Sequence, residues 1–305
     1  MDPSCLDPEI AAALDLGPHL PPMSTATLSE HRESMRMDAV ALSERVLRTE
    51  HLTAPNGPIM RIHTPTDVDG PLPCLYWMHG GGLVMGDRFM DDQRFDVWCA
   101  RHSMIAAVVE YRLAPEHPYP AAVEDCAAGL AWLVAHADEL GMDRDRIGVG
   151  GASAGGGLAA ALALVNRDRM LTHLHFQLLV YPMLDDRPTE SSTRPDLVRW
   201  PNGSNRYAWQ NYLAGHTPGP DGHASPARAD DLRGLPRTYI CVGTHDGFLD
   251  EDVEYARRLV HADVPVDLRI HAGLPHGYDS IAPRAAAVRR ANRDLNEWLA
   301  LAVQR

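Results

Sequence analysis

The fold of this chain is decided by one stretch, which reads Arg146-Ile-Gly-Val-Gly-Gly151-Ala152-Ser153-Ala154-Gly155-Gly156-Gly157-Leu158-Ala-Ala-Ala-Leu-Ala-Leu-Val165. A short segment with β-propensity leads into Ser153, and an Ala/Leu-rich segment typical of a helix leads away from it. Glycine stands two places before and two places after the serine, which is the G-x-S-x-G pattern of a nucleophile elbow. The alternative is a merely structural Gly/Ala-rich contact between a strand and a helix. The pattern favours a nucleophilic serine on a strained turn. The N-terminus of the helix that follows would stabilise negative charge developing at this serine.

Length, charge and composition exclude several classes of function. The 305 residues suit one large α/β domain or two small ones, and the formal net charge is −13. So negative a chain is a poor partner for nucleic acid or an anionic membrane. All the cationic side chains are arginine, since the sequence contains no lysine. Schiff-base chemistry, a phosphate-loop lysine and a serine–lysine nucleophile pair are therefore excluded.

Cysteine usage and the first residues indicate a cytoplasmic protein. The five cysteines are dispersed, without a Cys-x-x-Cys pair, which favours reduced thiols over a disulfide framework. The opening residues lack the basic-then-apolar order of a signal peptide. No apolar run is long enough to cross a bilayer, so we expect no membrane insertion.

Strands and helices are expected to alternate over most of the chain. Strands are predicted on either side of a hairpin turn at Asn56-Gly57, and at 73–78, 104–109, 176–180, 238–242 and 266–270. Helices are predicted at 28–47, 91–102, 120–140, after Ser153, near 206–213, and at 250–261 and 285–301. This alternation predicts a mostly parallel central sheet covered by helices on both faces, with ligands bound beyond the carboxyl ends of the strands.

Two segments interrupt the alternation. Residues 1–45 are rich in helix formers and methionine, with no sign of a strand, so we expect them to pack outside the core. Residues 183–225 hold prolines, glycines and tryptophans, and they read as an insertion. The core is therefore expected in two parts, 46–182 and 226–305.

Partners for Ser153 stand at the ends of later strands. A serine hydroxyl needs a base to take its proton and a carboxylate to orient that base. The strand near Val242 runs into Asp246, and the last strand runs into a glycine-flanked loop at His276. The order Ser153, Asp246, His276 is that of an α/β-hydrolase triad.

Other residues compete for these roles. Among the sixteen histidines, His271 lies within or at the end of its strand and is expected to pack, while His245 is expected to point away from the side occupied by Asp246. Three further carboxyl groups, on Asp185, Asp250 and Glu251, are interpreted as helix-start or surface groups. The pair His173-x-His175 lacks a third ligand nearby, so we expect no metal site.

A glycine run after His79 supplies the expected oxyanion hole. The segment Gly80-Gly81-Gly82 follows a strand, and only residues without side chains let backbone N–H groups approach a substrate closely. We expect the donors to be the N–H groups of Gly80, Gly81 and Ala154. His79 is expected to anchor the loop by hydrogen bonding, not to act as the base.

Together these motifs resemble the bacterial hormone-sensitive-lipase family of α/β-hydrolases, the family IV esterases. The resemblance rests on His79-Gly-Gly-Gly82, Tyr111-Arg-Leu-Ala-Pro-Glu-His-Pro-Tyr-Pro120, Gly151-Ala-Ser-Ala-Gly-Gly156, Ser225-Pro-Ala-Arg228, Asp246-x-x-x-Asp250-Glu251 and His276-Gly-Tyr278. It covers nearly the whole chain. The sequence departs from the family pattern at four positions, where Leu83 replaces an aromatic residue, Ala152 an Asp or Thr, Gly157 an Asn and Gly247 a Pro.

The resemblance implies an α/β-hydrolase fold and hydrolysis of small carboxylic esters without a cofactor. It also implies a helical cap built from residues 1–45 and 183–225. Gly82, Leu83 and Tyr278 are expected to line the substrate pocket, with Leu83 reshaping one wall. The enclosed pocket that a cap creates favours short- to medium-chain esters. The oligomeric state stays open, with a homodimer as one alternative.

Two other functions remain in competition. Plant gibberellin receptors resemble the same family but lack the histidine, so a ligand-binding protein is the alternative from another class; the presence of His276 ranks it lower. Within enzymes, an amidase, lactonase or deacetylase would use the same three residues.

Overall fold

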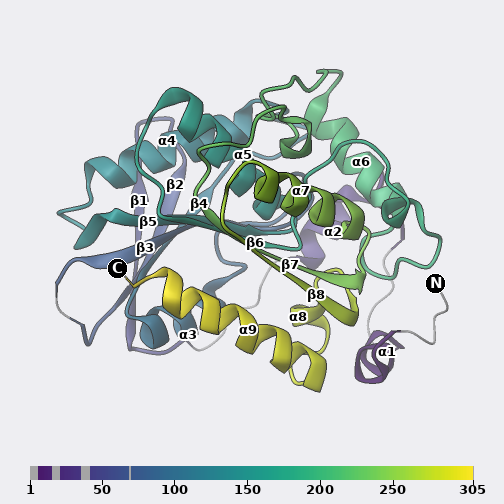
Figure 1. Ribbon diagram of the computed structural model, residues 1–305, viewed down its shortest axis with the longest axis horizontal. Helices are drawn as coiled ribbons and strands as arrows, with labels where there is room; N and C mark the ends of the chain where they lie inside the picture. Colours follow the sequence, from purple (N-terminus) through teal and green to yellow (C-terminus); the bar gives the residue numbers. More distant parts are fainter. Residues whose placement is uncertain (1–5, 16–20, 36–41, 69, 305) are drawn as a thin grey trace.

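The computed structural model of the chain describes residues 6–15, 21–35, 42–68 and 70–304 (Figure 1). Within these residues, eight strands form one sheet in the order β1-β2-β4-β3-β5-β6-β7-β8. The strands are β1 (Val46–Leu52), β2 (Ile59–Pro65), β3 (Leu72–Met78), β4 (Ile105–Glu110), β5 (Met142–Ala152), β6 (Phe176–Val180), β7 (Arg237–His245) and β8 (Val266–Pro275). Pairing is antiparallel from β1 to β2 and from β2 to β4, and parallel elsewhere. The predicted mostly parallel α/β sheet is therefore confirmed.

Helices cover both faces of this sheet (Figure 1). They are α1 (Pro8–Asp15), α2 (Leu28–Ser34), α3 (Asp92–His102), α4 (Ala121–Ala135), α5 (Ala154–Arg169), α6 (Asn202–Leu213), α7 (Leu249–His261), α8 (Tyr278–Ile281) and α9 (Ala286–Ala302). One core cluster joins α4, α5, α6 and α7 to one face, and a second joins α1, α3, α8 and α9 to the other. Because the central strands are buried on both faces, β3 and β6 consist entirely of buried residues.

Two predicted helices end earlier than expected. The helix predicted over 28–47 ends at Ser34, whose hydroxyl donates to the carbonyl of His31, and Val46 already belongs to β1; residues 36–41 lie outside the described residues. The helix predicted over 120–140 ends at Ala135. There the backbone N–H of His136 and its Nδ1 both bind the carbonyl of Trp132, which caps the helix.

The two N-terminal helices, α1 and α2, pack against different parts of the molecule. Helix α2 lies against the loop after β3, where Arg32 donates to the carbonyl of Val84 at 2.8 Å and pairs with Glu116 at 2.7 Å. The backbone N–H of Met23 donates to the hydroxyl of Ser204 on α6, so the segment that leads into α2 contacts the insertion. Helix α1 instead packs beside α8 within the second core cluster.

Helix α7 buries two acidic side chains behind the end of β7. Glu251 and Asp252 are 3% and 0% exposed. Oε1 of Glu251 accepts the N–H groups of Leu184 and Asp185, whereas neither carboxyl oxygen of Asp252 has a partner among the described residues. Burial, together with the neighbouring acidic groups, raises the pKa of both carboxyls well above the ordinary range. Glu251 lies in the first turn of α7, which confirms its interpretation as a helix-start group, but its side chain is buried and does not lie at the surface.

The described residues contain neither a disulfide nor a helix that could cross a membrane. Four cysteines, Cys74, Cys99, Cys126 and Cys241, are free and buried, and Cys5 lies outside the described residues. Among the helices that the structure describes, none combines the length and the apolar character needed to cross a membrane.

Replacing Gly155 by alanine is expected to disrupt the core. A Cβ at this position would lie 2.0 Å from the carbonyl oxygen of Met78 and 2.5 Å from that of His79, and backbone atoms cannot rotate away. We expect Gly155→Ala to lose several kcal/mol of unfolding free energy in urea denaturation, or to fail to fold. The control is Gly203→Ala on α6, where a Cβ meets nothing within 4 Å and the change should gain up to about 1 kcal/mol. Equal stability of the two variants would contradict this packing.

Asp252 should make folding stability depend on pH. The folded protein keeps this carboxyl protonated, whereas the unfolded chain releases the proton near pH 4. Its contribution is therefore complete below that pH and is lost as pH rises toward the raised folded pKa, by up to about 1.4 kcal/mol per unit. We expect the stability of Asp252→Asn relative to the unchanged protein to grow between pH 5 and 8, measured by denaturant unfolding, while the exposed Asp230→Asn shows no such trend. Parallel curves for the two variants would refute this role.

Candidate active site

Three side chains from three strand ends meet at the carboxyl edge of the sheet. Ser153 follows β5, Asp246 follows β7, and His276 follows β8. His276 Nε2 lies 2.9 Å from Ser153 Oγ, and His276 Nδ1 lies 2.8 Å from Asp246 Oδ2. Asp246 is 1% exposed, and its other oxygen accepts the N–H of Phe248 at 3.0 Å. The structure thus brings the predicted alcohol, imidazole and carboxylate into one hydrogen-bonded chain.

Ser153 sits on a strained turn between strand and helix. Its backbone has φ 58° and ψ −124°, a conformation that side chains disfavour. Its N–H donates to the carbonyl of Val180, and its carbonyl accepts the N–H of Met183, so the end of β6 and the segment after it hold the turn in place. A Cβ at Gly151 would lie 2.2 Å from the carbonyl oxygen of Gly155, and a Cβ at Gly155 would lie 2.0 Å from that of Met78. These distances explain why the positions two residues before and two residues after Ser153 must be glycine.

The glycine loop after β3 presents backbone donors beside Ser153. Within the described residues, the N–H groups of Gly80, Gly81 and Ala154 donate to no protein acceptor. A Cβ on Gly80 would come 3.5 Å from that of Ser153, so the loop and the serine are in close contact. These free donors can stabilise a negatively charged oxygen that develops next to Ser153 Oγ.

His79 braces this loop. Its Nδ1 donates to the carbonyl of Gly80 at 2.8 Å, and its ring stacks on Tyr111 with centroids 4.2 Å apart. The hydroxyl of Tyr111 donates to the carbonyl of His79 at 2.7 Å. Burial lowers the pKa of His79, so its imidazole stays neutral. These contacts agree with an anchoring role and keep His79 from acting as the base.

The competing residues make other contacts. His271 is buried within β8, and His245 is buried with neither ring nitrogen bonded to a described residue. Asp250 accepts the backbone N–H of Ser191 at 2.7 Å, and Asp185 pairs with Arg187. Asp185 is buried, so its interpretation as a surface group is wrong.

The three residues expected to line a pocket are placed differently from one another. Gly82 lies under the ring of Trp200, since a Cβ there would meet Trp200 Cη2 at 2.4 Å. Leu83 is 4% exposed within the first core cluster, with φ 66°. Tyr278 is 2% exposed, with its hydroxyl 3.7 Å from Cys241 Sγ and its ring against Tyr181 and His271. Tyr278 therefore packs within the second core cluster, and its place in a pocket wall stays a prediction.

Three aromatic rings that the sequence did not single out surround His276. Ring centroids of Tyr181 and Phe248 lie 4.9 Å from the imidazole centroid, and that of Trp200 lies 6.3 Å away. Tyr181 directly follows β6, and Phe248 comes shortly after β7. Their positions after strands are the same signal that points to Asp246, although this signal alone does not distinguish an aromatic residue of the site from one of the core. Trp200 belongs to the insertion, where no sequence pattern marks it.

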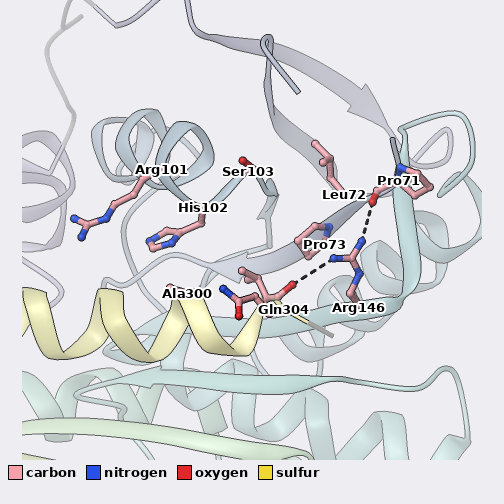
Figure 2. A pocket seen from close by; sticks show the side chains of 10 residues that line it. Pro71, Leu72, Pro73, Arg101, His102, Ser103, Arg146, Ala300 and Gln304 are labelled. Carbon is pink, nitrogen blue, oxygen red and sulfur yellow. Dashed lines mark hydrogen bonds between the residues drawn. The ribbon is translucent and has the colours of Figure 1, made fainter. Parts of the chain in front are cut away.

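Two cavities lie away from this cluster. One, of about 450 Å³, is lined by Leu72, Arg101, Arg146 and Gln304 among others (Figure 2). Leu72 begins β3, so this cavity opens near the amino ends of the strands, and Arg146 donates to the carbonyl of Pro71 there. The other, of about 620 Å³, is lined largely by charged side chains near α7. Neither is lined by Ser153, Asp246 or His276, so side-chain chemistry, not cavity size, identifies the candidate site.

The chain is similar to known proteins over most of its length. Residues 75–280 match a family model described as the α/β-hydrolase fold. Esterase LipI of Mycobacterium tuberculosis is 37% identical over 255 residues, which cover 80% of this chain and 78% of that protein. Carboxylesterase NlhH of the same species is 37% identical over 236 residues, or 73% of this chain and 72% of that one.

Solved structures agree with these sequence relatives. A structure titled as a bacterial heroin esterase superposes with a TM-score of 0.91 and 36% identity, and covers 100% of both chains. Esterase LipW from Mycobacterium marinum gives a TM-score of 0.87 and 33% identity over 99% of this chain and 97% of that one. The chain therefore belongs to the α/β-hydrolase family, in its hormone-sensitive-lipase branch (family IV), whose members are serine hydrolases that act on carboxylic ester bonds.

Proposed function

We propose that this enzyme hydrolyses short- to medium-chain carboxylic esters through Ser153, His276 and Asp246 and an acyl-enzyme intermediate. One observation carries the proposal: the unbroken chain of hydrogen bonds from Ser153 Oγ through the imidazole to the buried carboxylate, at 2.9 and 2.8 Å. Family membership supports ester hydrolysis, since similar proteins carry the names esterase and carboxylesterase.

In the first half-reaction, Ser153 Oγ attacks the carbonyl carbon and passes its proton to His276 Nε2. Asp246 accepts from Nδ1, which keeps Nε2 free as the base and stabilises the imidazolium. The carbonyl oxygen becomes an oxyanion, which accepts hydrogen bonds from the N–H groups of Gly80, Gly81 and Ala154. When the tetrahedral intermediate collapses, the bond to the alcohol oxygen breaks and His276 returns the proton to that oxygen.

In the second half-reaction, a water molecule replaces the alcohol. His276 takes a proton from the water as its oxygen attacks the acyl carbon, and the same N–H groups stabilise the second oxyanion. Collapse then breaks the bond to Ser153 Oγ, which regains its proton. The products are a carboxylic acid and the regenerated serine, so the cycle consumes only ester and water.

Residues 1–45 and 183–225 are proposed to form a cap over the core parts 46–182 and 226–305. Two contacts support this proposal. Arg32 of the first segment donates a hydrogen bond to the loop that follows the glycines. The hydrogen bond from the N–H of Met23 to the hydroxyl of Ser204 joins the two cap segments. Helix α1 packs on the core instead, so the cap function is proposed mainly for the segment around α2 and for the insertion.

Trp200 supports the preference for shorter chains. The ring is 8% exposed, fills the space above Gly82 and approaches His276. Its Nε1 donates to Asn205 Oδ1 at 3.2 Å, which fixes the ring in this position. A bulky group entering beside the glycine loop would have to displace this ring.

Ser153→Ala should abolish hydrolysis of p-nitrophenyl butyrate, with kcat lower by about four to six orders of magnitude. An aryl phosphonate should label the unchanged enzyme at Ser153, as located by mass spectrometry of the peptides. Ser103→Ala, at the opposite edge of the sheet, provides the control and should keep full activity. Turnover that survives in Ser153→Ala, or a label on another residue, would defeat the proposal.

Shortening Trp200 should broaden chain-length preference. Trp200→Leu removes the ring edge that faces Gly82 but leaves an apolar side chain. Across p-nitrophenyl esters from acetate to laurate, we expect the ratio of kcat/KM for octanoate to that for acetate to rise about tenfold or more, since each methylene in a pocket contributes about 1–3 kcal/mol. Trp132→Leu on α4, away from the site, should leave this ratio as it is. If the ratio is the same in both variants, Trp200 does not limit the pocket.

A further inference from the structure

Tyr181 has an unusual position beside His276. It follows the last residue of β6 and has φ 37°, a left-handed conformation that is costly for an aromatic residue. Its N–H donates to the carbonyl of Cys241 at 2.7 Å, which holds this backbone in place. As a result, the phenol ring meets the imidazole nearly edge to face, with an interplanar angle of 70°.

The hydroxyl of Tyr181 leads back to the loop that carries His276. It donates to Asp279 Oδ1 at 2.7 Å, and Asp279 stands three residues after His276 at the start of α8. Burial raises the pKa of Tyr181 well above its ordinary value, so the hydroxyl keeps its proton and acts as the donor. The ring and the hydroxyl of one residue therefore contact both ends of the same short segment.

A half-buried arginine, Arg94, anchors this arrangement to the core. Arg94 Nη2 donates to Asp279 Oδ2 at 2.6 Å, and Arg94 Nε lies 3.2 Å from Asp91 Oδ1. Asp91 in turn accepts the Nε1 proton of Trp77 on β3 at 2.7 Å. The guanidinium also lies over the rings of Trp77 and Trp98, 5.2 and 5.3 Å from their centroids. The loop of His276 is thus connected to β3 and α3 through fixed side chains.

The exposure of these groups argues against substrate binding by Tyr181. The residue is 4% exposed, and its hydroxyl is committed to Asp279, so it offers little surface to a substrate. The guanidinium of Arg94 lies between the carboxylates of Asp279 and Asp91, so its positive charge offsets part of the negative charge near the imidazole.

We propose that Tyr181 and Asp279 are positioning residues for His276: the chain Tyr181–Asp279–Arg94 holds the imidazole at the angle that keeps Nε2 aimed at Ser153 Oγ. The inference rests on the proposed function of His276 as the general base. Reaction geometry is sensitive to displacements of about 1 Å, which can cost about a hundredfold in rate. A hydroxyl that never touches the substrate can therefore affect turnover.

The test compares Tyr181→Phe and Asp279→Asn with Tyr239→Phe. The first removes the hydroxyl and keeps the ring, and the second weakens the link to Arg94. Tyr239 is a fully buried tyrosine on β7 whose hydroxyl has no partner among the described residues, so it matches the chemical change away from the site. For each variant, kcat and KM for p-nitrophenyl butyrate, the pH dependence of kcat/KM, the rate of Ser153 labelling by an aryl phosphonate and the melting temperature are measured.

We expect Tyr181→Phe and Asp279→Asn each to lower kcat about ten- to a hundredfold. KM should change by less than about twofold, and the labelling rate should fall in parallel with kcat/KM. The pH midpoint should stay in place in Tyr181→Phe, because this substitution changes no charge near the imidazole. Because both groups act through one link, the double variant should be no worse than the poorer single one, and Tyr239→Phe should remain fully active.

Several outcomes would overturn the proposal. Unchanged kcat in a folded Tyr181→Phe or Asp279→Asn would do so. A raised KM with intact kcat would make Tyr181 a pocket wall, and a displaced pH midpoint with intact plateau rate would make the network an electrostatic device. Failure of the proposed function is recognised separately, because Ser153→Ala would then retain activity whatever the behaviour of Tyr181.

Discussion

Direct contact between backbones is the constraint on which the rest of this structure depends. Helix α5 approaches β3 so closely that Gly155 touches the carbonyls of Met78 and His79, while Gly157 touches that of Met183 beyond β6. No side chain fits between these segments. Backbone contacts therefore hold three segments close together: the turn at Ser153, the glycine loop and the end of β6. Free N–H donors and the hydroxyl of Ser153 can share such a small space only because larger side chains are absent from it.

Backbone strain is concentrated at the carboxyl edge of the sheet, where these close backbone contacts occur. Ser103, Met170 and Ala214 have positive φ because each ends a helix, where a left-handed residue is ordinary. Leu83, Ser153 and Tyr181 also have positive φ, but none of them ends a helix. They lie in the glycine loop, at the elbow and after β6. Each such residue costs about 1–3 kcal/mol, and the packed sheet beneath supplies the stability that maintains it.

Sequence patterns predict the scaffold and the three central groups for one physical reason. Parallel strands end at one edge, so residues after successive strands must meet, and Ser153, Asp246 and His276 all follow strands. The same rule is ambiguous for aromatic residues, because Tyr181 at a strand end could equally be core. Trp200 is fixed by a tertiary contact with Gly82, which no local pattern encodes. Helix α4 ends at Ala135 because the ring of His136 binds the carbonyl of Trp132. The spacing of apolar residues along the helix cannot predict this interaction.

Burial of acidic groups behind Asp246 has a consequence for the base. Glu251 and Asp252 lie close to Asp246, and burial raises the pKa of both carboxyls well above the ordinary range, which favours the neutral acid. His276 therefore faces one hydrogen-bonded carboxylate instead of a cluster of three negative charges. Three ionised carboxylates would stabilise the imidazolium so strongly that it would return its proton to a leaving alcohol only slowly. The burial of these two carboxyls thus costs stability at neutral pH, yet in the proposed mechanism it keeps the proton of His276 available for both halves of the acyl transfer.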